Sequence, residues 1–207
     1  IFLVLYYFTE GLARDERSRL LAIVSSTPAR TGALVLGRMA ACATVIGTAV
    51  FGGLWISMSI AMVVQAVKSG ILIAPSPMPL LLAAFALLLP TLFAWMGFLA
   101  LAWSQFRNRY AVYAAGLGAL ILTGWCVQNG WMNWVFNWHL WDGMQWTDFG
   151  ALQLDRGALV LNRVLWILMG LVFLHAALEW WRRRTPDAQG ISTRLRGLRA
   201  WKRVARL

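Results

Sequence analysis

Four tryptophans form the clearest pattern of side chains in the sequence that could bind a ligand or a membrane. Residues 129–143 read NGWMNWVFNWHLWDG, and the tryptophans in it are Trp131, Trp134, Trp138 and Trp141, at spacings of three, four and three. Such spacings put side chains on one face of a helix. An aromatic face can stack on nucleic-acid bases, hold a sugar, pack in a protein core or lie at a membrane interface. The rest of the chain has to decide among these four interpretations.

Other residues that could perform catalysis are few. The chain has two histidines, His139 and His175, and contains neither an H-E-x-x-H zinc motif nor a G-x-x-x-x-G-K-[ST] phosphate loop. His175 and Glu179 are one helical turn apart and could relay a proton, but the aromatic and basic residues that follow favour anchoring at an interface. We therefore expect no catalytic residue, no metal site and no cofactor in this chain.

The composition is that of a membrane protein. Hydrophobic residues make up 60% of the 207 residues and charged residues 13%, with a mean hydropathy of +0.63. A soluble domain of this size could not bury so much apolar surface. The sequence therefore predicts a helical protein that crosses the membrane several times.

Several segments are long enough to cross a bilayer. Three runs without charged residues exceed the roughly 20 residues that span a bilayer core; they are residues 39–67, 69–106 and 110–141. Residues 159–181 form another span, with Arg163 and Glu179 close enough to its ends to reach an interface. The opening IFLVLYYF resembles the end of a helix that begins further upstream. The expected fold is an all-α bundle of about five spans, forming a single domain over residues 1–207.

The basic residues predict the orientation of these spans. The net charge is +11, and all basic residues except Arg38, Lys68, Arg156 and Arg163 fall in three stretches, residues 14–30, 107–109 and 182–206. If these stretches lie on the cytoplasmic side, the spans alternate correctly and the positive-inside rule explains the charge. A nucleic-acid partner is then unnecessary. We expect a multi-pass protein of the bacterial inner membrane, with outer segments near residues 68–79 and 128–158.

This topology favours one interpretation of the tryptophans. Residues 130–143 lie just past the outer end of a span, at the depth where amphipathic rings gather. We expect a helix in the outer interface, with Trp131, Trp134, Trp138 and Trp141 facing lipid, rather than a sugar or headgroup site. The following residues, 144–163, either dip back into the membrane beside an exit path or form an ordinary outer loop.

The most informative segment is the cytoplasmic loop at residues 9–31, TEGLARDERSRLLAIVSSTPART. Charged residues precede an apolar patch that begins at Leu20, and Pro28 ends the expected helix. A short amphipathic helix between two spans offers a charged face to a soluble partner and an apolar face to the membrane domain. It is suited to transmit motion between the two.

The same residues resemble the cytoplasmic loop of ABC type-2 transporter permeases. In that loop a Glu-Arg pair is followed by a leucine-rich turn, a Ser/Thr-Pro pair and a basic residue. The matching positions are Glu16, Arg17, Leu20, Thr27, Pro28 and Arg30. Three features depart from the pattern: Ser18 stands where glycine is usual, the acidic residue usual within the helix is absent, and the loop is about one residue longer than the common form.

The resemblance implies a transport function. A permease of this type has six spans, so the chain would hold the end of the second span through the sixth. It would act as an exporter subunit driven by a separate ABC ATPase dimer, which binds ATP–Mg, and would pair with a second permease copy or a homologous permease. The loop residues Glu16 to Arg30 would form the coupling helix that contacts the ATPase.

A different class of function stays open. The stretch WTDFGALQLDRGALVLNR is similar to permease-like membrane domains that are joined to a metallo-aminopeptidase in some bacterial proteins. The chain would then be the membrane anchor or membrane domain of a larger enzyme. The basic tail at residues 182–207 fits either function, because it can lie on the anionic inner leaflet or begin a linker to a further domain.

Overall fold

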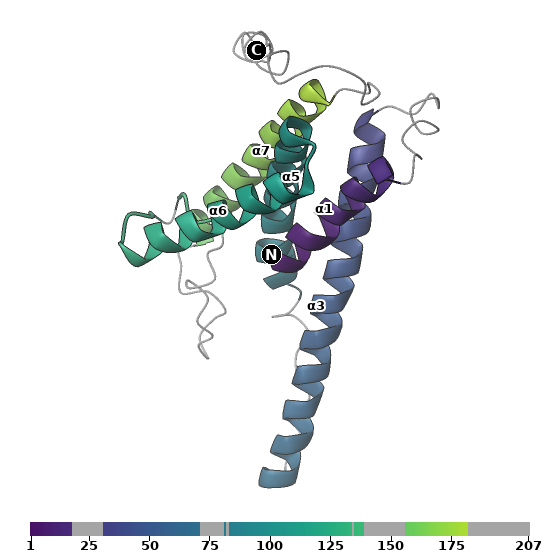
Figure 1. Ribbon diagram of the computed structural model, residues 1–207. Helices are drawn as coiled ribbons and strands as arrows, with labels where there is room; N and C mark the ends of the chain where they lie inside the picture. Colours follow the sequence, from purple (N-terminus) through teal and green to yellow (C-terminus); the bar gives the residue numbers. More distant parts are fainter. Residues whose placement is uncertain (18–30, 71–80, 82, 134, 139–155, 182–207) are drawn as a thin grey trace.

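A computed structural model describes residues 1–17, 31–70, 81, 83–133, 135–138 and 156–181 (Figure 1). Every regular element in these residues is a helix. The elements are α1 (Phe2–Arg17), α3 (Thr31–Ser69), the π-helix η1 (Ala83–Leu88), α5 (Leu89–Phe106), α6 (Arg109–Gln128) and α7 (Arg156–Trp180).

The predicted membrane character is confirmed at the level of the helices. Four of them are long and apolar enough to cross a membrane: α3, η1 together with α5, α6, and α7. The first predicted span corresponds to α1, whose 16 residues fall short of that length. The total of about five spans therefore stays a prediction.

Helix α5 is the centre of the fold and contacts α1, α3, α6 and α7. Its buried residues include Leu92, Trp95, Leu99 and Trp103, which recur at steps of three or four along the helix. Helix α1 meets this core with one face, formed by Val4, Leu5, Phe8 and Leu12. The large hydrophobic side chains of the other helices are often exposed, which suits helices that meet lipid.

The closest helix pair is α5 and α7, and two glycines permit the approach. A Cβ atom added at Gly97 would lie 2.8 Å from the carbonyl oxygen of Gly170, and one added at Gly170 would lie 2.7 Å from the Phe93 ring. Small residues let two membrane helices bring their backbones together. The two glycines therefore set the distance between α5 and α7.

This contact gives a stability prediction. We expect Gly97→Ala to lower the free energy of unfolding by about 1 to 3 kcal/mol, because the new methyl group meets backbone that cannot rotate away. The measurement is unfolding in detergent micelles, followed by circular dichroism. Gly118→Ala is the matched control, since a Cβ there has no atom within 4 Å and alanine favours the helix. Equal stability of the two variants would contradict the close packing.

The start of α5 departs from α-helical geometry. Pro90, near the first residue of α5, has no backbone N–H and cannot continue the α-helical hydrogen-bond ladder. The preceding residues, Ala83–Leu88, form the π-helix η1, in which each carbonyl bonds to a more distant N–H. The π-helix and proline leave carbonyl oxygens in this turn available to side chains from elsewhere.

Helix α3 is too long for the membrane core. Its 39 residues span about 58 Å at 1.5 Å per residue, against a hydrocarbon core of about 30 Å. Figure 1 shows its second half extending beyond the other helices. The exposed apolar residues in that half are Leu54, Trp55, Ile56, Ile60, Val63, Val64 and Val67. This half of α3 is thus an apolar surface that no described part of the chain covers.

The predicted tryptophan helix is wrong for the residues that the structure describes. Helix α6 ends at Gln128, and the N–H groups of Gly130 and Trp131 donate to the carbonyls of Val127 and Cys126. This Schellman arrangement places Gly130 at a φ of +68°, which reverses the chain. Of the residues that follow, 131–133 have no regular structure, Val135 and Phe136 form a turn, and Trp138 lies in a bend. Gly130 thus ends α6, and no new helix begins within residues 131–133 and 135–138.

Arg163 is a second correction. It was expected to reach a membrane interface, but only 5% of it is exposed. Its guanidinium group points between the start of α5 and Trp138, where it donates to oxygen atoms of both. The side chain therefore belongs to the interior of the bundle.

Candidate functional site

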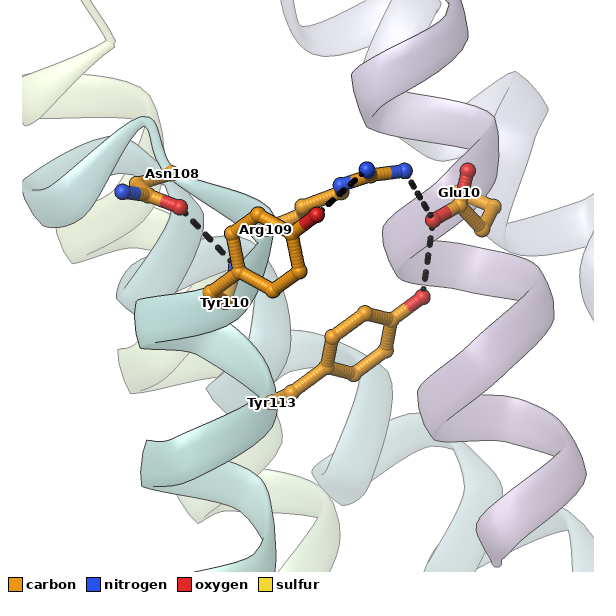
Figure 2. Close-up of polar contacts among 5 residues, drawn as sticks. All are labelled: Glu10, Asn108, Arg109, Tyr110 and Tyr113. Carbon is orange, nitrogen blue, oxygen red and sulfur yellow. Dashed lines mark hydrogen bonds and ion pairs between the residues drawn. The ribbon is translucent and has the colours of Figure 1, made fainter.

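A polar contact joins α1 to the start of α6. Figure 2 shows Glu10 of α1 facing Arg109 and Tyr113 of α6. The Glu10 Oε1 atom lies 3.3 Å from Arg109 Nη1 and accepts a hydrogen bond from the Tyr113 hydroxyl at 3.1 Å. One carboxylate oxygen thus receives a charged and a neutral donor from successive turns of the same helix.

The turn between α5 and α6 holds Arg109 in place. Arg107 has left-handed backbone angles, φ 46° and ψ 28°, and its N–H still donates to Trp103 O. Asn108 caps α6, because its side-chain oxygen accepts from the Tyr110 N–H at 2.9 Å. The Arg109 guanidinium donates to the Tyr110 hydroxyl at 2.7 Å and lies 4.6 Å from the centre of that ring. The short turn therefore aims Arg109 at α1.

The contact is only partly shielded from solvent. The Arg109 and Glu10 side chains are 31% and 29% exposed. An ion pair in such a setting contributes little to stability because water and salt screen it. Its value is positional, since it fixes how α1 lies against α6. Packing further along reinforces this, because a Cβ at Gly116 of α6 would lie 2.5 Å from Leu5 of α1.

Other contacts bring the neighbouring helix ends together. The Arg38 guanidinium of α3 donates to the Gly11 carbonyl of α1 at 3.2 Å, and a Cβ at Gly32 of α3 would lie 3.6 Å from Leu178 of α7. The end of α1, the start of α3, the start of α6 and the end of α7 therefore share one end of the bundle. We call it the basic end; its described cations are Arg14, Arg38, Arg107 and Arg109.

The basic end agrees with the alternation that the charge clusters predicted. The clusters at residues 14–30, 107–109 and 182–206 adjoin the ends of α1, α5 and α7. These three helices end on the same side of the fold. The side of the membrane that this end faces stays a prediction.

The expected coupling residues lie at and beyond the basic end. Glu16 and Arg17 are the last two residues of α1, less than two turns after Glu10. The segment predicted as a loop from Thr9 therefore begins as helix, and Thr9 itself is buried. Four expected residues, Leu20, Thr27, Pro28 and Arg30, lie outside the described residues.

Of the four tryptophans expected at the membrane interface, the two that the structure describes, Trp131 and Trp138, lie in different surroundings. Trp131 is 70% exposed and packs edge to face with Trp125. Trp138 is 7% exposed and stacks on Trp95 of α5, with ring centres 5.2 Å apart. Trp134 and Trp141 lie outside the described residues. An interfacial role stays a prediction for Trp131, whereas Trp138 belongs to the core.

Sequence reasoning missed Glu10 and Tyr113. Glu10 is the one charged residue in the first thirteen, which are otherwise mostly apolar. A carboxylate in an apolar helix needs a cationic or hydrogen-bonding partner. Arg109, in the basic turn at residues 107–109, is the cation that the fold brings to Glu10.

No protein-family model, curated protein or solved structure matches the chain. The resemblance to ABC type-2 permeases therefore rests on the motif residues from Glu16 to Arg30, which begin at the end of α1.

Proposed function

We propose that this chain is the membrane-spanning subunit of an ATP-driven ABC exporter in the bacterial inner membrane. The observation that carries the proposal is the position of the permease-like motif. Glu16 and Arg17 open the motif and also end α1, the helix whose Glu10 contacts α6. A force applied at the motif therefore acts directly on a helix that is tied to the bundle.

The proposed mechanism starts in a separate ATPase dimer, which binds ATP–Mg and closes. Its surface displaces the charged end of α1 and the coupling segment that follows. Helix α1 is continuous from Phe2 to Arg17, so the displacement reaches Glu10 without a flexible joint. The contacts of Glu10 with Arg109 and of Gly11 with Arg38 then move α6 and α3.

A second permease subunit is the proposed neighbour of α3. The half of α3 after Gly53 carries exposed apolar residues and extends past the other helices. A helix longer than the hydrocarbon core can tilt or pack against another protein. A permease dimer would bury part of this surface and leave lipid to cover the rest.

The experiment that tests the function is reconstitution with candidate ABC ATPases from the same cells. We expect one ATPase to co-purify with the chain as a stable complex and to hydrolyse ATP faster in its presence. If no candidate binds and no hydrolysis is stimulated, the exporter proposal fails. The chain is then better explained as the membrane anchor of a larger enzyme.

The contact between α1 and α6 provides a more specific readout. We expect Glu10→Gln to leave the ATPase bound but to reduce the stimulation of ATP hydrolysis, because the variant loses the charge that holds Arg109. Glu179→Gln is the matched control, since Glu179 is an exposed acidic residue at the same end of the bundle, on α7. Equal stimulation by both variants would remove Glu10 from the mechanism.

A further inference from the structure

Arg163 of α7 is a buried cation whose described hydrogen-bond partners are all uncharged. Its Nη1 atom donates to the Thr91 hydroxyl at 3.0 Å, to the Trp138 carbonyl at 3.4 Å and, at the long limit of 3.5 Å, to the Leu87 carbonyl. None of these oxygens carries a charge. An arginine removed from water normally needs an anionic partner to offset the loss of hydration.

The other edge of the same guanidinium is free. The Nε and Nη2 atoms are both buried and have no hydrogen-bond partner. Their N–H bonds point in parallel, and this side-on pair is the geometry that binds two oxygens of one carboxylate or phosphate. Because Nη1 alone donates to all three acceptors, the Nε–Nη2 edge of Arg163 keeps both of its N–H donors for another ligand.

The surroundings hold that edge in a fixed orientation. The Thr91 hydroxyl donates to the Trp138 carbonyl at 3.1 Å. These two oxygens, which both accept from Nη1, are therefore also hydrogen-bonded to each other. Asn162, the neighbour of Arg163 on α7, donates to the carbonyls of Val135 and Asn137. These contacts fasten the segment before Trp138 to α7. A donor pair held in this way loses little freedom when it binds an anion.

The position of Arg163 indicates the kind of anion. It lies about two helical turns into α7, beside the first residues of α5, and thus near the end of the bundle opposite the basic end. In a protein whose helices cross a membrane, that depth lies close to the headgroups of one leaflet. The anionic group that all phospholipids carry at this depth is a phosphate ester.

We propose that the Nε–Nη2 edge of Arg163 binds the phosphate oxygens of an anionic phospholipid headgroup. The same chemistry would accept a free phosphate ester. The proposal does not depend on ATP-driven export, because it concerns binding at the opposite end of the bundle.

The test measures binding to the purified, delipidated chain in detergent. The probes are a short-chain phosphatidylglycerol, the diacylglycerol with the same acyl chains, and inorganic phosphate. Binding is followed by the intrinsic tryptophan fluorescence, to which Trp138 and Trp95 beside the site contribute, and by the midpoint of thermal unfolding. We expect phosphatidylglycerol to bind saturably and to raise the midpoint, and diacylglycerol to do neither, because diacylglycerol lacks the phosphoglycerol headgroup.

Substitutions assign the effect to Arg163. We expect Arg163→Gln to weaken phosphatidylglycerol binding at least about tenfold. Arg163→Lys keeps the charge but lacks the two-pronged edge, and we expect it to bind more weakly than the parent. Lys68→Gln is the control: it removes one positive charge at the exposed end of α3 and should bind like the parent. Circular dichroism verifies that each variant retains its helices; if Arg163→Gln does not fold, Arg163→Lys decides the outcome.

Several results would overturn the proposal. One is equal binding of phosphatidylglycerol and diacylglycerol by the parent, which would indicate acyl-chain contacts alone. Another is a folded Arg163→Lys variant, or a folded Arg163→Gln variant, that binds like the parent. A third result combines two observations: the parent binds neither phosphatidylglycerol nor inorganic phosphate, and Asp148→Asn or Asp155→Asn destabilises the chain as much as Arg163→Gln does. A carboxylate of the chain itself would then occupy the Nε–Nη2 edge. Binding of inorganic phosphate that depends on Arg163 would support the site and identify a free phosphate as sufficient.

Discussion

Replacing Trp138 with alanine should lower the free energy of unfolding by about 3 to 5 kcal/mol, the range expected when a large buried aromatic side chain is removed. The indole is 7% exposed and lies parallel to Trp95 at 5.2 Å, within the core around α5. Its Nε1 donates to the Thr123 hydroxyl of α6 at 3.2 Å. The loss of this ring therefore separates α5 from α6 as well as leaving a cavity.

The measurement is unfolding in mixed micelles, followed by circular dichroism. Trp138→Phe should recover part of the loss, because a smaller ring can still stack on Trp95 but cannot donate to Thr123. Trp131→Ala is the control, since Trp131 is 70% exposed, and its replacement should change the stability by less than about 1 kcal/mol. A Trp138→Ala variant as stable as Trp131→Ala would contradict the assignment of Trp138 to the core.

Trp138 also illustrates what the sequence could not predict. A tryptophan stripe has the same spacing whether it faces lipid or core, so periodicity alone cannot choose between them. The partner that decides is Trp95, which lies far upstream, and only the fold brings the two rings together. A local signal did exist, because the Asn129–Gly130 pair is a strong helix-ending sequence. That pair predicts the end of α6 but does not decide whether a second helix follows it, so it leaves the structure of the stripe open.

Features that depend on neighbouring residues in the sequence were easier to predict than features that depend on the packing of distant helices. The apolar runs predicted membrane-spanning helices, and α3, α5 and α6 lie within or close to those runs. The break between α5 and α6 follows from the charged turn at residues 107–109. The contact of Glu10 with Arg109 could have been inferred from the need of an isolated carboxylate for a cation.

The environment of Arg163 could not have been predicted in the same way. Its acceptors include the backbone carbonyls of Leu87 and Trp138, which have no signature in the sequence. Both carbonyls are placed by irregular backbone, one in a π-helix and the other in a turn. Irregular backbone depends on the packing of the whole bundle more than on local preferences.

Reversing the charge of Glu16 should abolish the coupling of ATP hydrolysis to transport. In the proposed exporter, Glu16 and Arg17 stand at the end of α1 and meet the ATPase surface. Removing one partner of a desolvated charged contact costs roughly 2 to 5 kcal/mol, which weakens the contact about 30-fold or more. The Glu16→Arg variant should therefore fold and insert into the membrane. The ATPase should still hydrolyse ATP in its presence, but substrate should no longer be transported.

Helix geometry explains why the effect should be large at Glu16. Helix α1 runs without interruption from Phe2 to Arg17, and Glu10 ties it to Arg109 and Tyr113. The turn between α5 and α6, by contrast, is only Arg107 and Asn108. Such a short turn offers little surface to a partner. In the proposed exporter, the end of α1 with the segment that follows would therefore be the main route for force into the described helices.

The experiment compares transport and ATP hydrolysis in proteoliposomes for the parent, Glu16→Arg, Arg17→Glu and Glu179→Arg. Glu179→Arg makes the same charge change at an exposed position of α7 at the basic end, and it should transport like the parent. A compensating charge reversal on the ATPase should restore transport to Glu16→Arg, because the contact would regain opposite charges. If both reversals at the end of α1 transport as well as the parent, these residues serve only to orient the chain in the membrane, and the coupling role is wrong.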